Sequence, residues 1–71
     1  MTQNDRVLRH LKEVGPITPL QAMESLGIMR LASRIHDLKW LGYQIVTSRV
    51  TTKNRWGERV SYSKYTLEEG T

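Results

Sequence analysis

The sequence predicts a small α+β domain in which three helices precede a two-stranded β-hairpin, and three observations predict it. Before Gly42, apolar residues recur every three or four positions, which is the spacing of helices with one buried face. Beyond Gly42 the period changes to two, in segments rich in Ile, Val, Thr and Tyr, which is typical of strands. Glycine and proline divide these segments into short elements.

The first helix is expected over about residues 3–14. Thr2 can accept a hydrogen bond at its start, and Gly15 followed by Pro16 ends it. Its apolar residues recur at the spacing of one helical face: Val7, Leu8, Leu11 and Val14. One side of this helix is therefore expected to pack against the rest of the domain.

A second, short helix is predicted to begin at Thr18. The run from Thr18 to Gln21 supplies a capping hydroxyl, a proline where its missing N–H is tolerated, and an amide that can reach back to the cap. Ala22 permits close approach of a neighbouring helix, and Gly27 ends the helix. We expect three of its apolar side chains to face inward: Leu20, Met23 and Leu26.

The third helix is expected within Met29–Leu41, with Gly42 as its C-terminal stop. Its single apolar stripe is formed by Leu31, Ile35 and Leu38. At about 100° per residue, other side chains point away from this stripe: Met29, Ser33, His36, Asp37 and Trp40. Arg30 and Arg34 lie on a flank, so the helix is expected to present a polar outer face beside two guanidinium groups.

The two strands are predicted over Tyr43–Val50 and Arg59–Leu67, around a basic tip in which Asn54 and Gly57 permit a tight turn. Without a bulge, the apolar residues of the second strand divide between its faces: Val60 and Tyr62 on one, Tyr65 and Leu67 on the other. The sequence leaves open which face is buried. We expect residues 1–67 to form the domain and residues 68–71 a short, flexible acidic tail.

The positive charge is concentrated in one part of the chain. The 71 residues carry a net charge of +4. Residues 30–64 alone hold eight Lys and Arg against two acidic residues, a net charge of +6, whereas residues 1–29 are neutral. This distribution favours a polyanionic partner for the third helix and the hairpin.

Several classes of protein are excluded or disfavoured by composition. A chain of this length is one domain rather than a multidomain enzyme, and without cysteine it has no disulfide and no thiolate metal site. No apolar run is long enough to span a membrane, and the first residues lack the pattern of a secretory signal. We therefore expect a cytoplasmic protein with no membrane association.

Two helices joined by a tight turn and followed by a basic hairpin match the winged form of the helix-turn-helix. In that arrangement the third helix of this chain enters the major groove of DNA. Its candidate DNA-binding residues are Met29, Arg30, Ser33, Arg34, Asp37 and Trp40. The hairpin, or wing, is expected to contact phosphates or the minor groove through Arg49, Lys53, Asn54, Arg55, Trp56 and Arg59.

The chain also resembles a known family over most of residues 5–67. The similarity rests on Ile17-Thr18, Gln21-Ala22, the run LGIMRLASRIHDL from Leu26 to Leu38, and the run GYQIVT from Gly42 to Thr47. This pattern is similar to the small winged helix-turn-helix proteins of bacteriophages and prophages. The resemblance implies double-stranded DNA binding by a transcriptional regulator or an excisionase-like recombination accessory factor. Met29 and Trp40 depart from the family pattern, at positions that are polar or charged there.

Several residues have a structural alternative. Arg34 and Asp37 are three positions apart and could form only a surface ion pair on the helix. Trp56 either covers the backbone of the wing or touches a partner. Trp40 either packs beneath the wing or marks a contact surface.

The sequence contains no pattern typical of an active site or a cofactor site. His10 and His36 are far apart and lack the acidic neighbours of a metal site, so we expect no metal and no cofactor. Ser33, His36 and Asp37 fall on one short helix, where they cannot line up as a catalytic triad, so we expect no enzymatic activity.

The expected partner is double-stranded DNA, bound by a homodimer or a cooperative multimer, together with a possible phage or host protein. Two alternatives remain open: a protein-binding adaptor that uses its two tryptophans, and a single-stranded nucleic acid binder that uses the aromatic residues of the wing.

Overall fold

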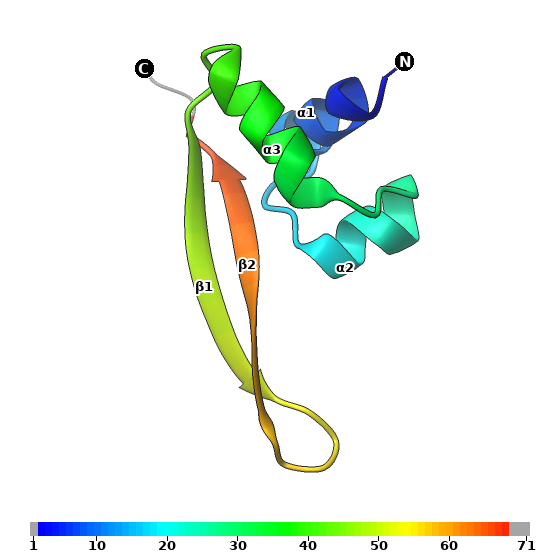
Figure 1. Ribbon diagram of the computed structural model, residues 1–71, viewed down its shortest axis with the longest axis vertical. Coiled ribbons are helices and arrows are strands. Elements are labelled where there is room, and N and C mark those ends of the chain that lie inside the picture. The colour runs from blue at the N-terminus through cyan, green and yellow to red at the C-terminus, as the bar shows by residue number, and fades with distance from the viewer. Residues whose placement is uncertain (1, 69–71) are drawn as a thin grey trace.

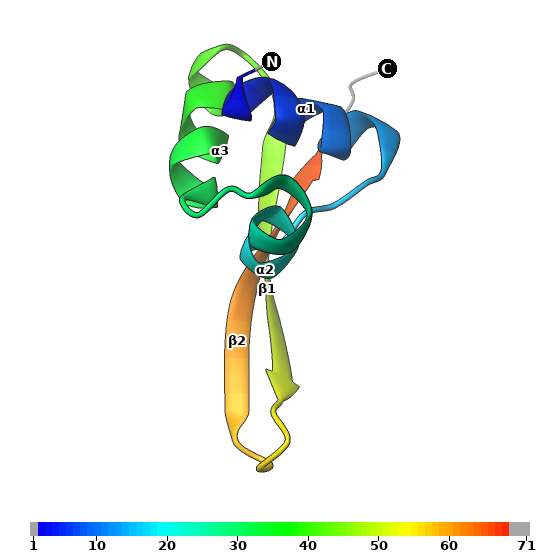
Figure 2. The same ribbon diagram turned by 90° about the vertical axis from the view of Figure 1, so that its right-hand side faces the viewer.

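A computed structural model describes residues 2–68 of the chain. The elements follow in the order α1 (Gln3–Glu13), α2 (Pro19–Gln21), a π-helical segment η1 (Ala22–Leu26), α3 (Leu31–Trp40), β1 (Ile45–Lys53) and β2 (Arg59–Leu67) (Figure 1). The helices gather at one end, and the antiparallel hairpin of β1 and β2 extends away from them in both views (Figures 1 and 2). This architecture confirms the predicted α+β winged helix-turn-helix.

Both predicted helix starts are confirmed, and both are capping boxes. The Thr2 hydroxyl accepts from the backbone N–H of Asp5, whose carboxylate accepts from the N–H of Thr2 in return. Thr18 and Gln21 make the same reciprocal pair at α2, where Pro19 is the first helical residue. Each box satisfies two backbone donors that a helix start otherwise leaves unpaired.

The second helix packs differently from the prediction. After one turn, α2 widens into η1, and within these two segments only Ala22 is buried, while Leu26 is half-buried. The expectation that Leu20 and Met23 face inward is wrong, since both are exposed. Met23 lies within η1, where the wider π-helical turn alters the direction in which a side chain points, whereas Leu20 precedes η1 and lines a groove together with Tyr62 of β2.

The third helix begins later than expected. α3 starts at Leu31, so Met29 and Arg30 precede the helix rather than form its first turn. Arg30 occupies the N-cap position, and its side chain makes no capping hydrogen bond. The predicted apolar stripe of α3 is confirmed, because its buried residues are Leu31, Ile35 and Leu38.

The two strands of the hairpin pair continuously, with no bulge, from Ile45 opposite Leu67 to Lys53 opposite Arg59. β1 therefore begins two residues later and ends three residues later than predicted, whereas β2 has its predicted bounds. Tyr65 is buried against the helices at the base of the hairpin, and Tyr62, on the opposite face, lies beside α2. The buried face is therefore the one that carries Tyr65 and Leu67, whereas Tyr62 on the other face stays exposed.

One short link joins the hairpin to the helices and was not predicted. Ile17, between α1 and α2, pairs with Tyr65 through two backbone hydrogen bonds of 2.9 Å. Ile17 is fully buried, and Ile45 of β1 belongs to the same core cluster. A bridge of a single residue has no periodicity, so no sequence pattern could have indicated it.

Candidate nucleic-acid interface

The outer face of α3 is the surface directly opposite its buried stripe. At about 100° per residue, the side chains farthest from that stripe belong to Ser33, His36 and Trp40. His36 and Trp40 are exposed and Ser33 is half-buried. Trp40 is 85% exposed, so the interpretation that it packs beneath the wing is wrong. This face is free to contact a partner.

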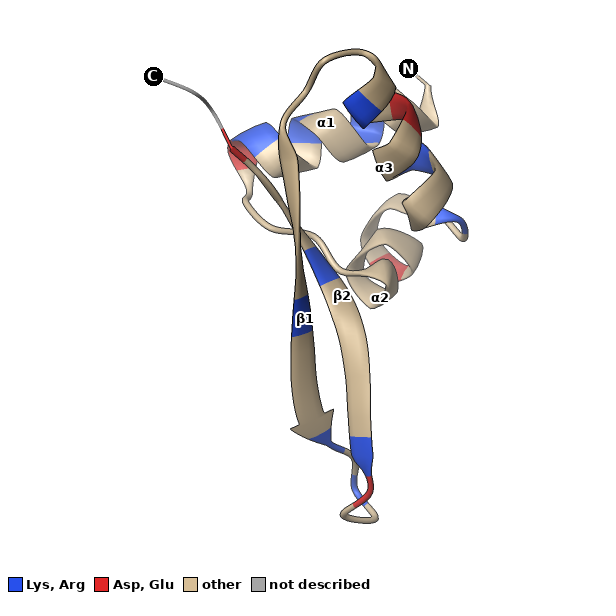
Figure 3. Ribbon diagram, turned by 60° about the vertical axis from the view of Figure 1, so that its left-hand side comes forward, with Lys and Arg blue, Asp and Glu red and all other residues tan. Residues whose placement is uncertain are grey.

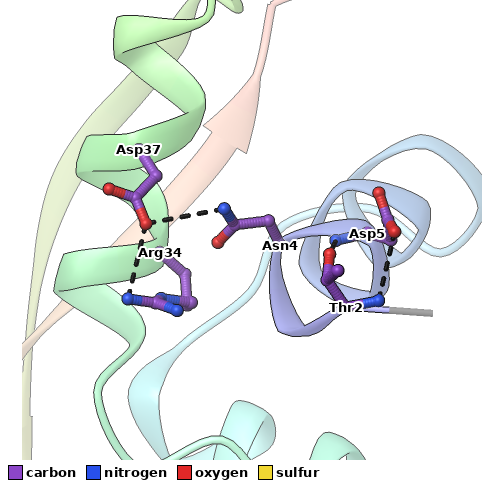
Figure 4. A network of polar contacts seen from close by, with 5 residues as sticks. All are labelled: Thr2, Asn4, Asp5, Arg34 and Asp37. Atoms are coloured by element: carbon purple, nitrogen blue, oxygen red, sulfur yellow. Dashed lines mark hydrogen bonds and ion pairs between the residues drawn. The ribbon is translucent and has the colours of Figure 1, made fainter.

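Arg34 and Asp37 lie on the flank of α3 that faces α1 (Figure 4). Arg34 Nη2 is 3.4 Å from Asp37 Oδ2, and the amide nitrogen of Asn4 donates to the same oxygen at 3.5 Å. Arg34 Nε and Asn4 Oδ1 are buried with no hydrogen-bond partner within residues 2–68. The predicted ion pair therefore exists and also joins α3 to α1, while DNA contact by its two residues stays a prediction.

Met29 and Arg30 stand at the entrance to α3. They line a cleft of about 330 Å³ together with Gln3, Gly27 and Arg34. Met29 is 77% exposed, and the exposed Arg30 side chain makes no hydrogen bond or ion pair with the residues that the structure describes, although the Arg30 carbonyl accepts from the N–H groups of Ser33 and Arg34. The Arg30 side chain is thus available to a partner at the end of α3 where recognition helices meet bases.

The tip of the hairpin is organised by the side chain of Asn54. Its Oδ1 accepts from the backbone N–H groups of Trp56 and Glu58, each at 3.0 Å, and its Nδ2 donates to the Glu58 carboxylate at 3.4 Å. Gly57 has a φ of 77° in the left-handed region and lies in the five-residue loop between β1 and β2. The predicted tight turn is confirmed. The Asn54 side chain thus makes its hydrogen bonds within the loop. Its contact with DNA stays a prediction.

Lys and Arg occur along α3, midway along the hairpin and around its loop (Figure 3). At the tip, Lys53 and Arg59 are directly opposite each other in the strand register. Like charges in that position repel each other in the free protein. An anion bound between them would remove this repulsion, which favours a phosphate as the partner of the tip.

Two of the three remaining cations of the hairpin, Arg49 and Arg55, contact other side chains of the hairpin. Arg49 Nη1 donates to Ser61 Oγ at 3.3 Å across the strands. In the loop, the Arg55 guanidinium lies 5.4 Å from the centre of the Trp56 ring, a cation–π contact. Trp56 is 75% exposed, so at least three quarters of its surface remains open to a partner.

An apolar groove of about 490 Å³ separates the helices from the hairpin. It is lined by Thr18, Pro19, Leu20, Met23, Met29 and Tyr62. The groove accounts for the exposure of Leu20 and Met23, whose side chains face the wing across it instead of the core.

A family model described as a winged helix-turn-helix domain matches residues 2–70. The chain belongs to this family. The winged helix-turn-helix is a DNA-binding fold, which assigns the chain to that class and does not favour a protein-binding adaptor. The comparison with curated proteins found no match, and neither did the comparison with solved structures.

Other kinds of site find no support in the described part of this winged helix-turn-helix protein. No three His, Cys, Asp or Glu residues within residues 2–68 are grouped so as to hold a metal ion. Over the same residues, no helix has the length and apolar character needed to cross a bilayer. Ser33, His36 and Asp37 share α3 as predicted, and Asp37 is engaged with Arg34 and Asn4.

Three residues relevant to the interface were not among the predicted site residues. His36 lies on the outer face of α3, as its helical position already indicated. Lys64 is half-buried and adds a cation midway along β2. Asn4 contacts Asp37 across 33 positions of sequence, and no local pattern could have revealed that contact.

Proposed function

We propose that this winged helix-turn-helix protein binds double-stranded DNA as a transcriptional regulator or an excisionase-like recombination accessory factor at a phage or prophage site. One observation carries the proposal: α3 has an open outer face and stands beside a hairpin with five Lys and Arg and one acidic residue. The phage or prophage setting is supported by the sequence resemblance alone.

The dimensions of the two elements suit a division of labour. The ten residues of α3 are about 15 Å long, which fits a major groove about 12 Å wide. Each nine-residue strand of the hairpin is about 30 Å long, so the tip reaches far beyond the helices to phosphates or to the neighbouring minor groove. In this arrangement α3 reads bases, and the hairpin supplies affinity.

The size of the domain implies more than one bound copy. A single module of this kind buries about 600–1,000 Å² on DNA, which gives limited sequence specificity. We propose that two or more copies bind adjacent sites or a palindrome, as a dimer or as a cooperative multimer.

The decisive experiment is selection of bound duplexes from a random DNA pool at a stated salt concentration. We expect one motif to be enriched, and we expect its binding constant to fall with salt with a log–log slope of about −0.9 per phosphate contacted. An affinity that is the same at low and high salt would overturn the proposal. So would failure to retain any duplex at low salt while a specific protein is captured, a result that would favour the adaptor.

A further inference from the structure

Trp40 is the most exposed of the large hydrophobic side chains described in the structure. It is the last residue of α3, and its indole packs against neither the core nor the hairpin. An exposed indole offers a partner a large apolar area together with one hydrogen-bond donor, so what Trp40 could contact depends on the surface that α3 faces.

The position of Trp40 on α3 places it in line with the proposed reading face. Trp40 follows Ser33 by seven residues, which is nearly two turns, so the two side chains project from the same side of the helix about 10 Å apart. Because that side is the one opposite the buried stripe, a helix that places Ser33 against DNA also turns Trp40 toward it.

The chemistry of the indole matches one base better than the others. An indole offers an apolar ring and one N–H donor, and it has no acceptor. In the major groove only thymine combines an apolar group, its C5-methyl, with an acceptor, its O4 atom. Cytosine presents a donor there, and guanine presents acceptors without a methyl group.

We infer that Trp40 reads the C5-methyl group of a thymine in the major groove. This inference rests on the proposed function, because it requires α3 to lie in that groove. Trp56 does not share this role, since it sits in the hairpin loop beside the Arg55 guanidinium, on the element proposed to contact phosphates or the minor groove.

The test replaces each thymine of the selected duplex, one at a time, with deoxyuridine, which removes only the methyl group. We expect one position per bound copy at which uracil weakens binding about fourfold, the effect of one buried methyl group. Trp40→Ala should bind the thymine and uracil duplexes equally at that position. Trp40→Phe, which keeps an apolar ring without the N–H, should retain the preference for thymine.

Trp56→Ala removes the other exposed tryptophan, which belongs to the proposed contact of the wing, so it should weaken thymine and uracil duplexes alike and keep the ratio between them at every position. Circular dichroism verifies that each variant is folded. A profile in which no thymine responds, or one that Trp40→Ala leaves unchanged, would overturn the inference and show that the ring packs on sugar or on another surface. Absence of any duplex binding would instead overturn the proposed function.

Discussion

The helices and the hairpin of this protein are stabilised in different ways. Ten apolar residues of the described chain are buried, and only Ile45 and Tyr65 among them come from the hairpin, both at its base. Between Val46 and Lys64 no residue is buried. The outer hairpin therefore depends on its strand ladder and its Asn54 loop, whereas the helices depend on a shared core.

This difference matches the division of labour in the proposed function. A segment without a buried face is free to carry charge, and five of the eleven Lys and Arg lie in the hairpin. The repulsion between Lys53 and Arg59 is tolerable there because both side chains are exposed to water and salt. The helices keep the geometry of α3, and the hairpin supplies the charge.

The largest expected effect separates the two regions by stability. Leu38→Ala removes a fully buried side chain and should lower the free energy of unfolding by about 2–5 kcal/mol. Val60→Ala, in the outer hairpin, should change it by no more than about 1 kcal/mol. Urea titrations monitored by circular dichroism measure both. Equal losses would show that the outer hairpin belongs to the core.

The next effect separates the two regions by DNA recognition. Arg30→Ala, at the entrance to α3, should cost about 1–3 kcal/mol and relax base preference at one position. Lys53→Ala, at the hairpin tip, should weaken all sequences alike and reduce the salt slope by about one. Repeating the duplex selection with each variant tests this difference. If the Arg30→Ala variant selects the same motif as the unmodified protein, the start of α3 does not read the bases.

Substitution of two glycines tests whether backbone strain lowers the stability of the whole domain or only that of the segment in which it is introduced. Gly27 and Gly57 have φ values of 69° and 77°, and an added Cβ would meet no atom at either position. Each substitution by alanine should therefore cost about 1–2 kcal/mol of backbone strain alone. We expect Gly27→Ala to lower global stability, whereas Gly57→Ala should mainly open the loop.

Hydrogen exchange distinguishes these outcomes for the two glycine variants. The amides of Asn54 and Glu58, which are hydrogen-bonded in the loop, should exchange faster in Gly57→Ala while the amides of α3 keep their protection. Faster exchange of α3 in that variant would mean that the hairpin tip and the helices unfold as one unit.

The smallest effect concerns the cap of α1. The backbone N–H of Thr2 donates to the Asp5 carboxylate, and this hydrogen bond lowers the pKa of Asp5 below its ordinary value. The stabilisation is therefore fully present above the ordinary pKa and is lost as the pH falls through the lowered pKa. Asp5→Asn should abolish this contribution to the pH dependence of the melting temperature. Asn54→Ala is the comparison in the hairpin, because the side chain that it removes carries no charge. This variant should make the loop amides exchange faster without changing how the melting temperature depends on pH near the pKa of Asp5.

The sequence by itself determined the features that depend on neighbours along the chain. The capping boxes at Thr2 and Thr18, the apolar stripe of α3 and the turn at Gly57 each need only residues within a few positions of one another. Such features follow from hydrogen-bonding capacity and helical period, which are local properties. The winged helix-turn-helix fold could be predicted because these local elements, in this order, leave few ways to pack.

The tertiary structure alone decided the features that join distant segments. Ile17 pairs with Tyr65, Asn4 reaches Asp37, and Leu20 faces a groove instead of the core. Each outcome depends on how the helices pack against one another and against the hairpin. Contacts between residues far apart in sequence produce no periodic pattern from which they could be predicted. The face of the hairpin that is buried was decided in the same way, because a regular strand offers both faces until the Ile17 bridge holds Tyr65 against the helices.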